Sequence, residues 1–207
     1  MPLPHHRPSR GHRLRAPLAA LLALALSAAP AHAQDHAADS DAPREDAGLL
    51  IPVAGVEPDE LRDSFHADRS GGREHQAIDI HAPEGTPVLA AADGTILKLQ
   101  RGSRGGITVY QLGGDGRTRY YYAHLARWAE GMEEGMRVRR GDTIGYVGDT
   151  GNAAPGDFHL HFSVAVLHDA RRWWEGATLN PYLLLRAASL RPFGLAPRST
   201  AASAALR

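Results

Sequence analysis

The segment Phe158–Phe162 alternates apolar residues with histidine, in the order Phe-His-Leu-His-Phe. Successive side chains of a β-strand point to opposite faces, so His159 and His161 share one face and the three apolar residues share the other. Buried polar side chains need partners, and two imidazoles on one face can bind the same metal ion. The segment therefore predicts a strand that packs one face into a core and presents two candidate metal ligands on the other.

Several other short runs rich in β-branched residues alternate with glycine, and no stretch carries a long helical period. We expect an Asp-Gly hairpin at Asp93-Gly94 and a second hairpin around residues 113–116. Residues 125–130 are the one expected helix. The predicted fold class is mostly β, with an antiparallel sheet. The expected strands are residues 86–91, 94–99, 107–112, 117–122, 143–147 and 159–166.

The N-terminal residues have the pattern of an export signal. Four arginines at 7, 10, 13 and 15 precede an apolar run over 16–29, and Ala31-His32-Ala33 supplies small residues for cleavage. The run is short for a transmembrane helix, although a retained N-terminal anchor is the alternative. We therefore predict a signal peptide over 1–33 and an exported product without a stable membrane anchor, in the periplasm or, alternatively, the extracellular medium.

Composition divides and limits the rest of the chain. Residues 34–48 are acidic and aperiodic and predict a disordered linker, 49–186 a folded domain, and 187–207 a low-complexity tail. Without the four leader arginines, 19 basic residues face 23 acidic ones, a net charge of −4, and no basic patch suggests nucleic acid. The chain has no cysteine, which excludes a thiol nucleophile, a disulfide framework, cysteine-bound zinc and lipid attachment through cysteine.

Two further pieces could complete a metal site with His159 and His161. His75 and Asp79 lie four residues apart at the expected start of a strand, and His124 follows an aromatic run. Catalytic zinc commonly takes three ligands from histidine and carboxylate and keeps a fourth position for water. Strand geometry alone does not say which of the two strand histidines would bind the metal.

The ordered set of motifs resembles the lysostaphin or LytM-type zinc metallopeptidases, which cut peptides of peptidoglycan. The resemblance covers roughly residues 52–185. Two residues depart from the family pattern: Ala77 stands where glycine is frequent, and Ser163 where glutamate is common. The matching elements are His75-x-x-x-Asp79, Ala82 to Val88 continuing to Ala91-Ala-Asp-Gly94, Tyr122-Ala-His124-Leu125, Arg140 to Gly145, Gly148-Asp-Thr-Gly151, His159-Leu-His161-Phe162 and Asn180-Pro-Tyr182.

The resemblance implies a role for each site residue. His75, Asp79 and His161 are similar to the family's zinc ligands, and His124 and His159 to the pair that orients water and stabilises the tetrahedral intermediate. From strand parity with His124, we also expect Tyr122 to face the site and contact substrate.

The resulting functional hypothesis is a zinc-dependent endopeptidase that hydrolyses peptide cross-links of bacterial cell-wall peptidoglycan, with zinc as cofactor and a cell-wall regulator protein as a possible partner. The scissile bond stays open. The main alternative is a non-catalytic LytM-like regulator that binds and activates another wall hydrolase. A carrier module is a weaker rival, because the only lysine, Lys98, falls within an expected strand.

The remaining histidines and the tryptophans are given ordinary structural roles. We expect three histidines to lie at the surface and favour packing over substrate contact for the tryptophans. These residues are His66, His81, His168, Trp128, Trp173 and Trp174.

Overall fold

Antiparallel strands are the predominant secondary structure of the described chain, far ahead of helix, which confirms the predicted fold class. The structure is a computed structural model that describes residues 48–69 and 71–190. The predicted leader and residues 34–47 of the predicted linker lie outside these residues. The strands are β1 (Asp68–Arg69), β2 (Arg73–Glu74), β3 (Ile78–His81), β4 (Pro87–Leu89), β5 (Gly94–Gly102), β6 (Gly106–Gly113), β7 (Thr118–Trp128), β8 (Arg137–Val138), β9 (Thr143–Val147), β10 (His159–Val166) and β11 (Ala177–Leu179).

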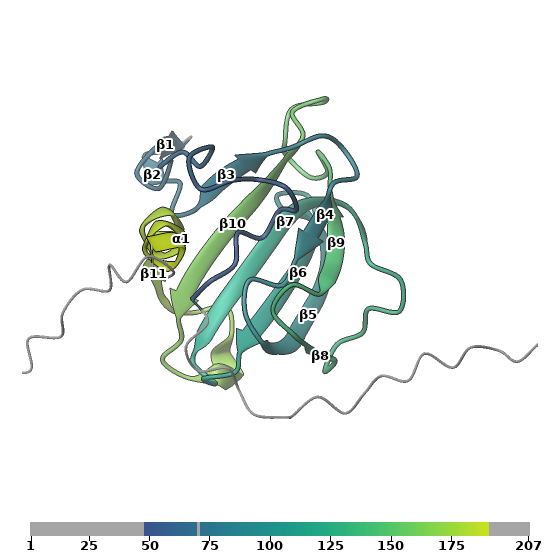
Figure 1. The fold of residues 1–207 in the computed structure, drawn as a ribbon, viewed down its shortest axis with the longest axis vertical. Coiled ribbons are helices and arrows are strands. Elements are labelled where there is room, and N and C mark those ends of the chain that lie inside the picture. Colours follow the sequence, from purple (N-terminus) through teal and green to yellow (C-terminus); the bar gives the residue numbers. More distant parts are fainter. Residues whose placement is uncertain (1–47, 70, 191–207) are drawn as a thin grey trace, which may run out of the picture. The chain divides into compact units, whose positions relative to one another are not determined.

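Nine of these strands form one sheet, in which β11, β10, β7, β6, β5 and β8 follow one another across the molecule (Figure 1). The remaining two, β1 and β2, form a separate small hairpin. Strand β3 pairs with the beginning of β10, and β4 joins the sheet through β9. The β6–β7 pair is the hairpin expected around residues 113–116.

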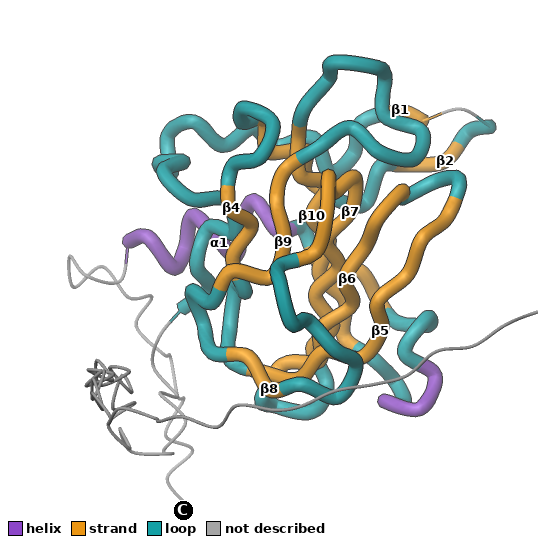
Figure 2. Tube along the Cα trace, turned by 90° about the vertical axis from the view of Figure 1, so that its right-hand side faces the viewer, coloured by secondary structure: helices purple, strands orange, loops and turns teal. Residues whose placement is uncertain are grey.

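The long strand β7 changes its partner part of the way along. Tyr122 pairs with Phe162 of β10, whereas Leu125 pairs with Val147 of β9. Both Tyr122 and Leu125 also pair with β6, so β9 replaces β10 on the other edge of β7. Strands β9 and β10 meet there, as Figure 2 shows, and His159 N donates to Gly148 O.

This change of partner explains one wrong prediction. The helix expected over 125–130 does not form, because the chain continues as strand to Trp128. Its backbone is held by pairing with β9, from Leu125–Val147 to Trp128–Gly145. Long-range strand pairing overrides a weak local helix preference.

The expected hairpin through Asp93-Gly94 is also wrong. Strand β4 pairs with β9, while β5 pairs with β6 and β8. Asp93 instead forms hydrogen bonds with two distant segments. Its Oδ1 accepts a hydrogen bond from Arg140 N at 2.7 Å, and its backbone O accepts one from Gly114 N at 3.0 Å. The turn carries the chain from one part of the sheet to another.

The core lies on the face of β10 away from its histidines. Leu160 and Phe162 are fully buried, as the alternation predicted, and pack with Ile78 and Ile80 of β3. Among the described residues, no helix is long and apolar enough to cross a membrane.

Two short helices follow β10: the 3-10 helix η1 (Ala170–Arg172) and the α-helix α1 (Pro181–Leu190). Asn180 caps α1 by accepting Tyr182 N at 3.0 Å, and the buried Leu185 anchors it. The helix ends four residues beyond the predicted domain boundary at 186, so the start of the predicted tail is helical.

Candidate functional site

Two neighbouring cross-strand pairs form the base of the site. His161 of β10 lies opposite Asp79 of β3, and His159 lies opposite His81. Because residues two apart on a strand share a face, all four side chains project from the same side of the sheet. Ile78, Ile80, Leu160 and Phe162 occupy the other side, in the core.

His75 completes a triangle with the first of these pairs. Its Nε2 lies 2.9 Å from His161 Nδ1 and 3.0 Å from Asp79 Oδ1, and the last two atoms lie 3.2 Å apart. The His75 side chain is almost completely buried, and those of Asp79 and His161 are about one-fifth exposed. The predicted ligand residues therefore come together, although they are up to 86 positions apart in the sequence.

Ser64 holds two members of this triangle in place. Its backbone O lies 3.0 Å from His75 Nδ1, which must donate because a carbonyl oxygen only accepts. His75 Nε2 then carries a lone pair directed at the other two ligand atoms. The Ser64 hydroxyl oxygen accepts the backbone N–H of Asp79 at 3.3 Å. Sequence reasoning missed Ser64, because nothing in its local context marks it.

The charge on Asp79 is stabilised from two sides. Burial alone would raise its pKa, but the neighbouring rings of His161 and His75 outweigh burial and hold the pKa of Asp79 well below its usual range. On the outer side, Arg69 Nη2 lies 2.6 Å from Asp79 Oδ2. Burial lowers the pKa of His161, so its imidazole is neutral near neutral pH and can offer a lone pair.

These three residues fit a zinc ion. Zinc–ligand distances of about 2.0–2.1 Å place neighbouring ligand atoms of a tetrahedron about 3.3 Å apart. The three observed separations, 2.9, 3.0 and 3.2 Å, are close to that value. Electron-rich atoms this close repel one another unless a cation or a proton lies between them, and two imidazoles with one carboxylate are a common catalytic zinc set.

His124 reaches the site through a break in the pleat of β7. Its φ of +61° is in the left-handed region, and two residues of β7, Ala123 and His124, face one residue of β6. Such a β-bulge re-aims a side chain and is frequent beside active sites. The bulge is fixed by His124 N, which donates to Gly105 O at 2.8 Å.

The His124 ring is oriented by the loop after β9. Its Nδ1–H donates to Thr150 O at 2.7 Å, which leaves Nε2 free on the other side of the ring. The ring centroid lies 4.9 Å from that of His159 and 5.8 Å from that of His161. Burial lowers the pKa of His124, so the ring is neutral near neutral pH.

His159 is held in a similar way. Its Nδ1–H donates to Asp157 O at 2.7 Å, and its Nε2 lies 3.9 Å from Asp79 Oδ1. The two predicted catalytic histidines thus flank the triangle, and each has its Nδ1–H on a backbone carbonyl. A neutral ring held this way has a lone pair on Nε2 that can take up a proton.

The expected substrate contact of Tyr122 is wrong. Tyr122 is fully buried, and its hydroxyl donates to Gln111 Oε1 at 2.7 Å and accepts Ala91 N at 3.0 Å. Strand parity would place Tyr122 beside His124, but the bulge between them shifts the alternation by one residue. Tyr122 therefore points into the core.

The other histidines and the tryptophans mostly follow expectation. His66, His81 and His168 are exposed, as predicted. Trp128 packs against the core and Trp173 against Tyr110, whereas Trp174 is exposed.

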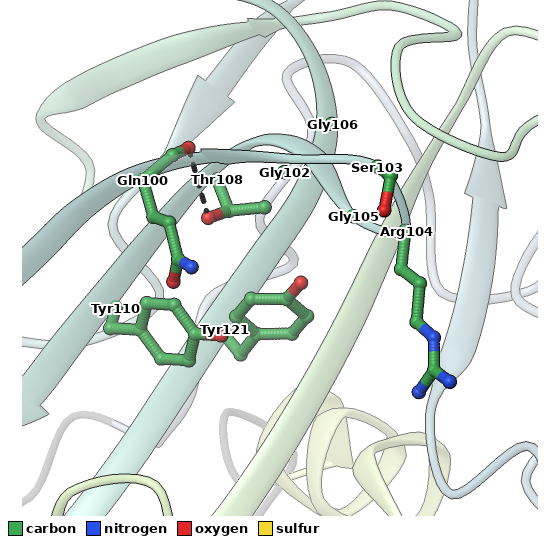
Figure 3. Close-up of a pocket in the computed structure, with 9 residues that line it drawn as sticks. All are labelled: Gln100, Gly102, Ser103, Arg104, Gly105, Gly106, Thr108, Tyr110 and Tyr121. Carbon is green, nitrogen blue, oxygen red and sulfur yellow. Dashed lines mark hydrogen bonds between the residues drawn. The ribbon is translucent and has the colours of Figure 1, made fainter.

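A pocket of about 360 Å³ is lined by residues of β5, β6 and β7 and of the β5–β6 turn (Figure 3). The rings of Tyr110 and Tyr121 lie together along it, and the Tyr121 ring centroid is 6.0 Å from that of His161. Arg104 is its one charged residue. The sequence did not reveal this pocket, because it depends on how the β5–β6 turn folds over β7. Its lining residues are Gln100, Gly102, Ser103, Arg104, Gly105, Gly106, Thr108, Tyr110 and Tyr121.

Comparison with known proteins finds relatives that are named as endopeptidases. DD-carboxypeptidase/endopeptidase Mpg of Neisseria meningitidis is 39% identical over 110 residues, which are 53% of this chain and 22% of that protein. The L-Ala–D-Glu endopeptidase of Bacillus subtilis is 31% identical over 122 residues, 56% of this chain and 36% of that protein. The chain thus spans between about a fifth and about a third of the length of these relatives.

A solved structure shows the same fold. The putative glycyl-glycine endopeptidase LytM of Ruminococcus gnavus matches with a TM-score of 0.54 and 27% identity, over 70% of this chain and 61% of that one. The family model described as Peptidase family M23 matches residues 73–181, which include all five predicted metal and catalytic residues. That match covers more than half of the chain, and the chain therefore belongs to peptidase family M23, the lysostaphin and LytM-type peptidases.

Proposed function

We propose that the protein is an exported, zinc-dependent endopeptidase that hydrolyses peptide cross-links of bacterial cell-wall peptidoglycan. The observation that carries the proposal is the triangle of His75 Nε2, Asp79 Oδ1 and His161 Nδ1, with edges of 2.9–3.2 Å. The names of relatives that act on peptidoglycan peptides support the substrate class. The N-terminal pattern over residues 1–33 supports export, and we propose the periplasm as its location.

In this proposal His75, Asp79 and His161 hold the metal. Zinc, when bound, polarises a carbonyl group and makes a water molecule more acidic. Ser64 keeps the His75 ring and the start of β3 in place, so that the three ligand atoms stay converged.

His124 and His159 move the protons of the reaction. The attacking water loses a proton to the Nε2 lone pair of one of them, and the leaving amine receives a proton as the peptide C–N bond breaks. One water is consumed, and one carboxylate and one amine are formed. The Nδ1–H donors to Thr150 O and Asp157 O keep both rings turned toward the triangle throughout.

The pocket beside His161 supplies room for the substrate peptide. Its lining carries hydrogen-bonding groups and a single charge, that of Arg104, which suits a peptide with free carboxylates. The tyrosine rings offer apolar surface to the peptide's alanine side chains.

The test is cleavage of cross-linked muropeptide dimers by the purified protein, with products identified by mass spectrometry. Conversion of dimers to monomers that stops with a chelator and returns with zinc is the expected result. His124→Ala, with its zinc content measured in the same sample, is the matched inactive control. Intact dimers beside wild-type protein that holds one zinc per chain would overturn the proposal in favour of the non-catalytic regulator.

A further inference from the structure

A second group of potential metal ligands lies next to the triangle, on the same face of the sheet. It consists of His81, Asp157 and His159, whose ligand atoms lie within 4.8 Å of one another. His81 Nε2 is 3.3 Å from Asp157 Oδ1, and Asp157 Oδ2 is 3.7 Å from His159 Nδ1. The rings of His81 and His159 lie 5.4 Å apart, with an angle of 36° between their planes.

Strand register explains why two groups arise side by side. The cross-strand pairs His161–Asp79 and His159–His81 are consecutive on one face of β3 and β10. Each pair needs one further ligand to become a set of three. His75, from the loop before β3, completes the first pair, and Asp157, just before β10, completes the second.

The two groups differ in burial. His75 is buried, whereas the side chains of His81 and Asp157 are 64% and 48% exposed. Solvent therefore reaches the second group from the side of His81, and binding there has to immobilise two solvent-exposed side chains at a cost in conformational entropy. Two imidazoles and one carboxylate again form a set suited to zinc.

We propose that His81, Asp157 and His159 form a second, weaker zinc site that shares His159 with the catalytic centre and inhibits it when filled. The site itself follows from the geometry, while its inhibitory effect rests on the proposed function. His159 faces both centres, since Nε2 is directed toward Asp79 and Nδ1 toward Asp157.

Filling this site changes what His159 can do. Its Nδ1 now carries the proton that is donated to Asp157 O. Zinc at Nδ1 takes the electron pair of that atom, so the hydrogen bond breaks and the proton moves to Nε2, with no net release. The Nε2 that faced the substrate with a lone pair then carries a hydrogen and can no longer accept the proton of the attacking water.

The test measures zinc bound per chain at equilibrium, at free zinc in excess, on variants of the full-length protein. Five histidines outside the described residues are potential ligands, so each variant is compared in the same background; they are His5, His6, His12, His32 and His36. We expect His81→Ala and Asp157→Asn each to bind one zinc fewer than wild type. His168→Ala, which removes an exposed histidine elsewhere, is the matched control and keeps the wild-type number.

Two further measurements distinguish a failure of the second zinc site from a failure of the proposed peptidase function. His159→Ala should lose the second zinc and keep the first, whereas His75→Ala should lose the first and keep the second. Activity, normalised for each variant to its own value without added zinc, should fall with excess zinc in wild type and in His168→Ala but not in His81→Ala. Equal zinc binding by wild type and His81→Ala would overturn the second site, whether or not the protein cleaves muropeptides.

Discussion

Strands β10 and β7 are neighbours in the sheet, and both bring histidines to the site, but by different means. Strand β10 is regular from His159 to Val166, so its two site histidines alternate with buried apolar residues. Strand β7 is bulged at His124, where φ is +61° and the partner strand changes from β10 to β9. The regular strand supplies His161, one of the three proposed metal ligands, and the bulged strand supplies His124, whose ring lies beside them.

The difference shows what each kind of strand can do. A regular strand places alternate side chains on the same face at a constant spacing. Ligands on neighbouring regular strands can therefore point to one metal position. A bulge places a single side chain outside that repeat, at a backbone cost of about 1–2 kcal/mol for a non-glycine residue. In the proposed mechanism, the bulge thus brings His124 near the metal without making it a ligand, as His159 is brought there by the regular strand.

The largest effect is expected when a proposed ligand on a regular strand, Asp79 of β3, is removed. Asp79→Ala removes one of three ligand atoms and leaves His75 Nε2 and His161 Nδ1 alone, so the purified protein should contain no zinc after dialysis into zinc-free buffer. The measurement is elemental analysis of metal per chain. The exposed Asp59→Ala serves as a control and should retain one zinc. Zinc retained by Asp79→Ala at the wild-type level would falsify the assignment of Asp79 as a ligand.

The next effect tests the bulged strand. His124→Ala should keep its zinc and lose about 10²–10⁴-fold in kcat, the usual contribution of a positioned proton-transfer group. Muropeptide cleavage and zinc content are measured on the same preparation. If zinc disappeared together with activity, His124 would have to be counted among the ligands, and the contrast between the two strands would fail.

A smaller effect tests the shift in alternation at the bulge. Tyr122→Phe leaves Gln111 Oε1 and Ala91 N without the hydroxyl they share in the core. We expect the free energy of unfolding to fall by about 1–3 kcal/mol, with kcat unchanged. Urea denaturation and the cleavage assay measure the two quantities. A lower kcat at unchanged stability would mean that Tyr122 contacts substrate after all.

The backbone cost of the bulge can be measured by itself. Glycine adopts a positive φ without penalty, so His124→Gly should be about 1 kcal/mol more stable than His124→Ala, although both lose activity. Denaturation of the two metal-free variants gives the difference. Equal stability would show that the chain relaxes out of the left-handed conformation when the imidazole is removed.

The smallest effect concerns pH. Burial lowers the pKa of His124 in the folded protein, so the unfolded chain binds this proton more readily. The metal-free protein should therefore lose stability as pH falls from about 7 to 5, through the unfolded histidine value of about 6.5. The depressed pKa of Asp79 adds nothing in this window, because its contribution is lost only at much lower pH.

His124→Ala provides the comparison for this pH effect. The variant should show a smaller decrease in the free energy of unfolding over the same range, with the contribution of His161 remaining in both proteins. Urea denaturation at several pH values measures it. A steeper decrease in the variant would reverse the sign expected from burial of His124.

Sequence reasoning worked where local pattern determines structure. The alternation in β10 and the β6–β7 hairpin follow from residues close together in the chain, and both are present. The three ligand candidates and the two flanking histidines were named from the motifs and lie in one cluster. Their roles stay a prediction until metal binding and activity are measured.

Sequence reasoning failed where pairing between segments far apart in the chain determines the structure. Strand β9 draws residues 125–128 into the sheet and takes β4 as its partner, which no local signal indicates. The bulge at His124, the Ser64 support and the approach of Asp157 to His81 likewise depend on contacts between segments far apart in the sequence. Strand parity misplaced Tyr122 for the same reason.

The ion pair between Arg69 and Asp79 bears on the coordination number that a metal would have at the proposed site. Asp79 turns Oδ1 toward His75 and His161, while Arg69 engages Oδ2 at 2.6 Å. The guanidinium draws electron density from Oδ2 and leaves Oδ1 as the better donor atom, so the ion pair favours monodentate ligation of a metal by Asp79. Bidentate ligation would fill an extra position around the ion. If Asp79 binds zinc as proposed, Arg69 in strand β1 thereby favours a single ligand atom from a residue ten positions away, and so leaves a place for water.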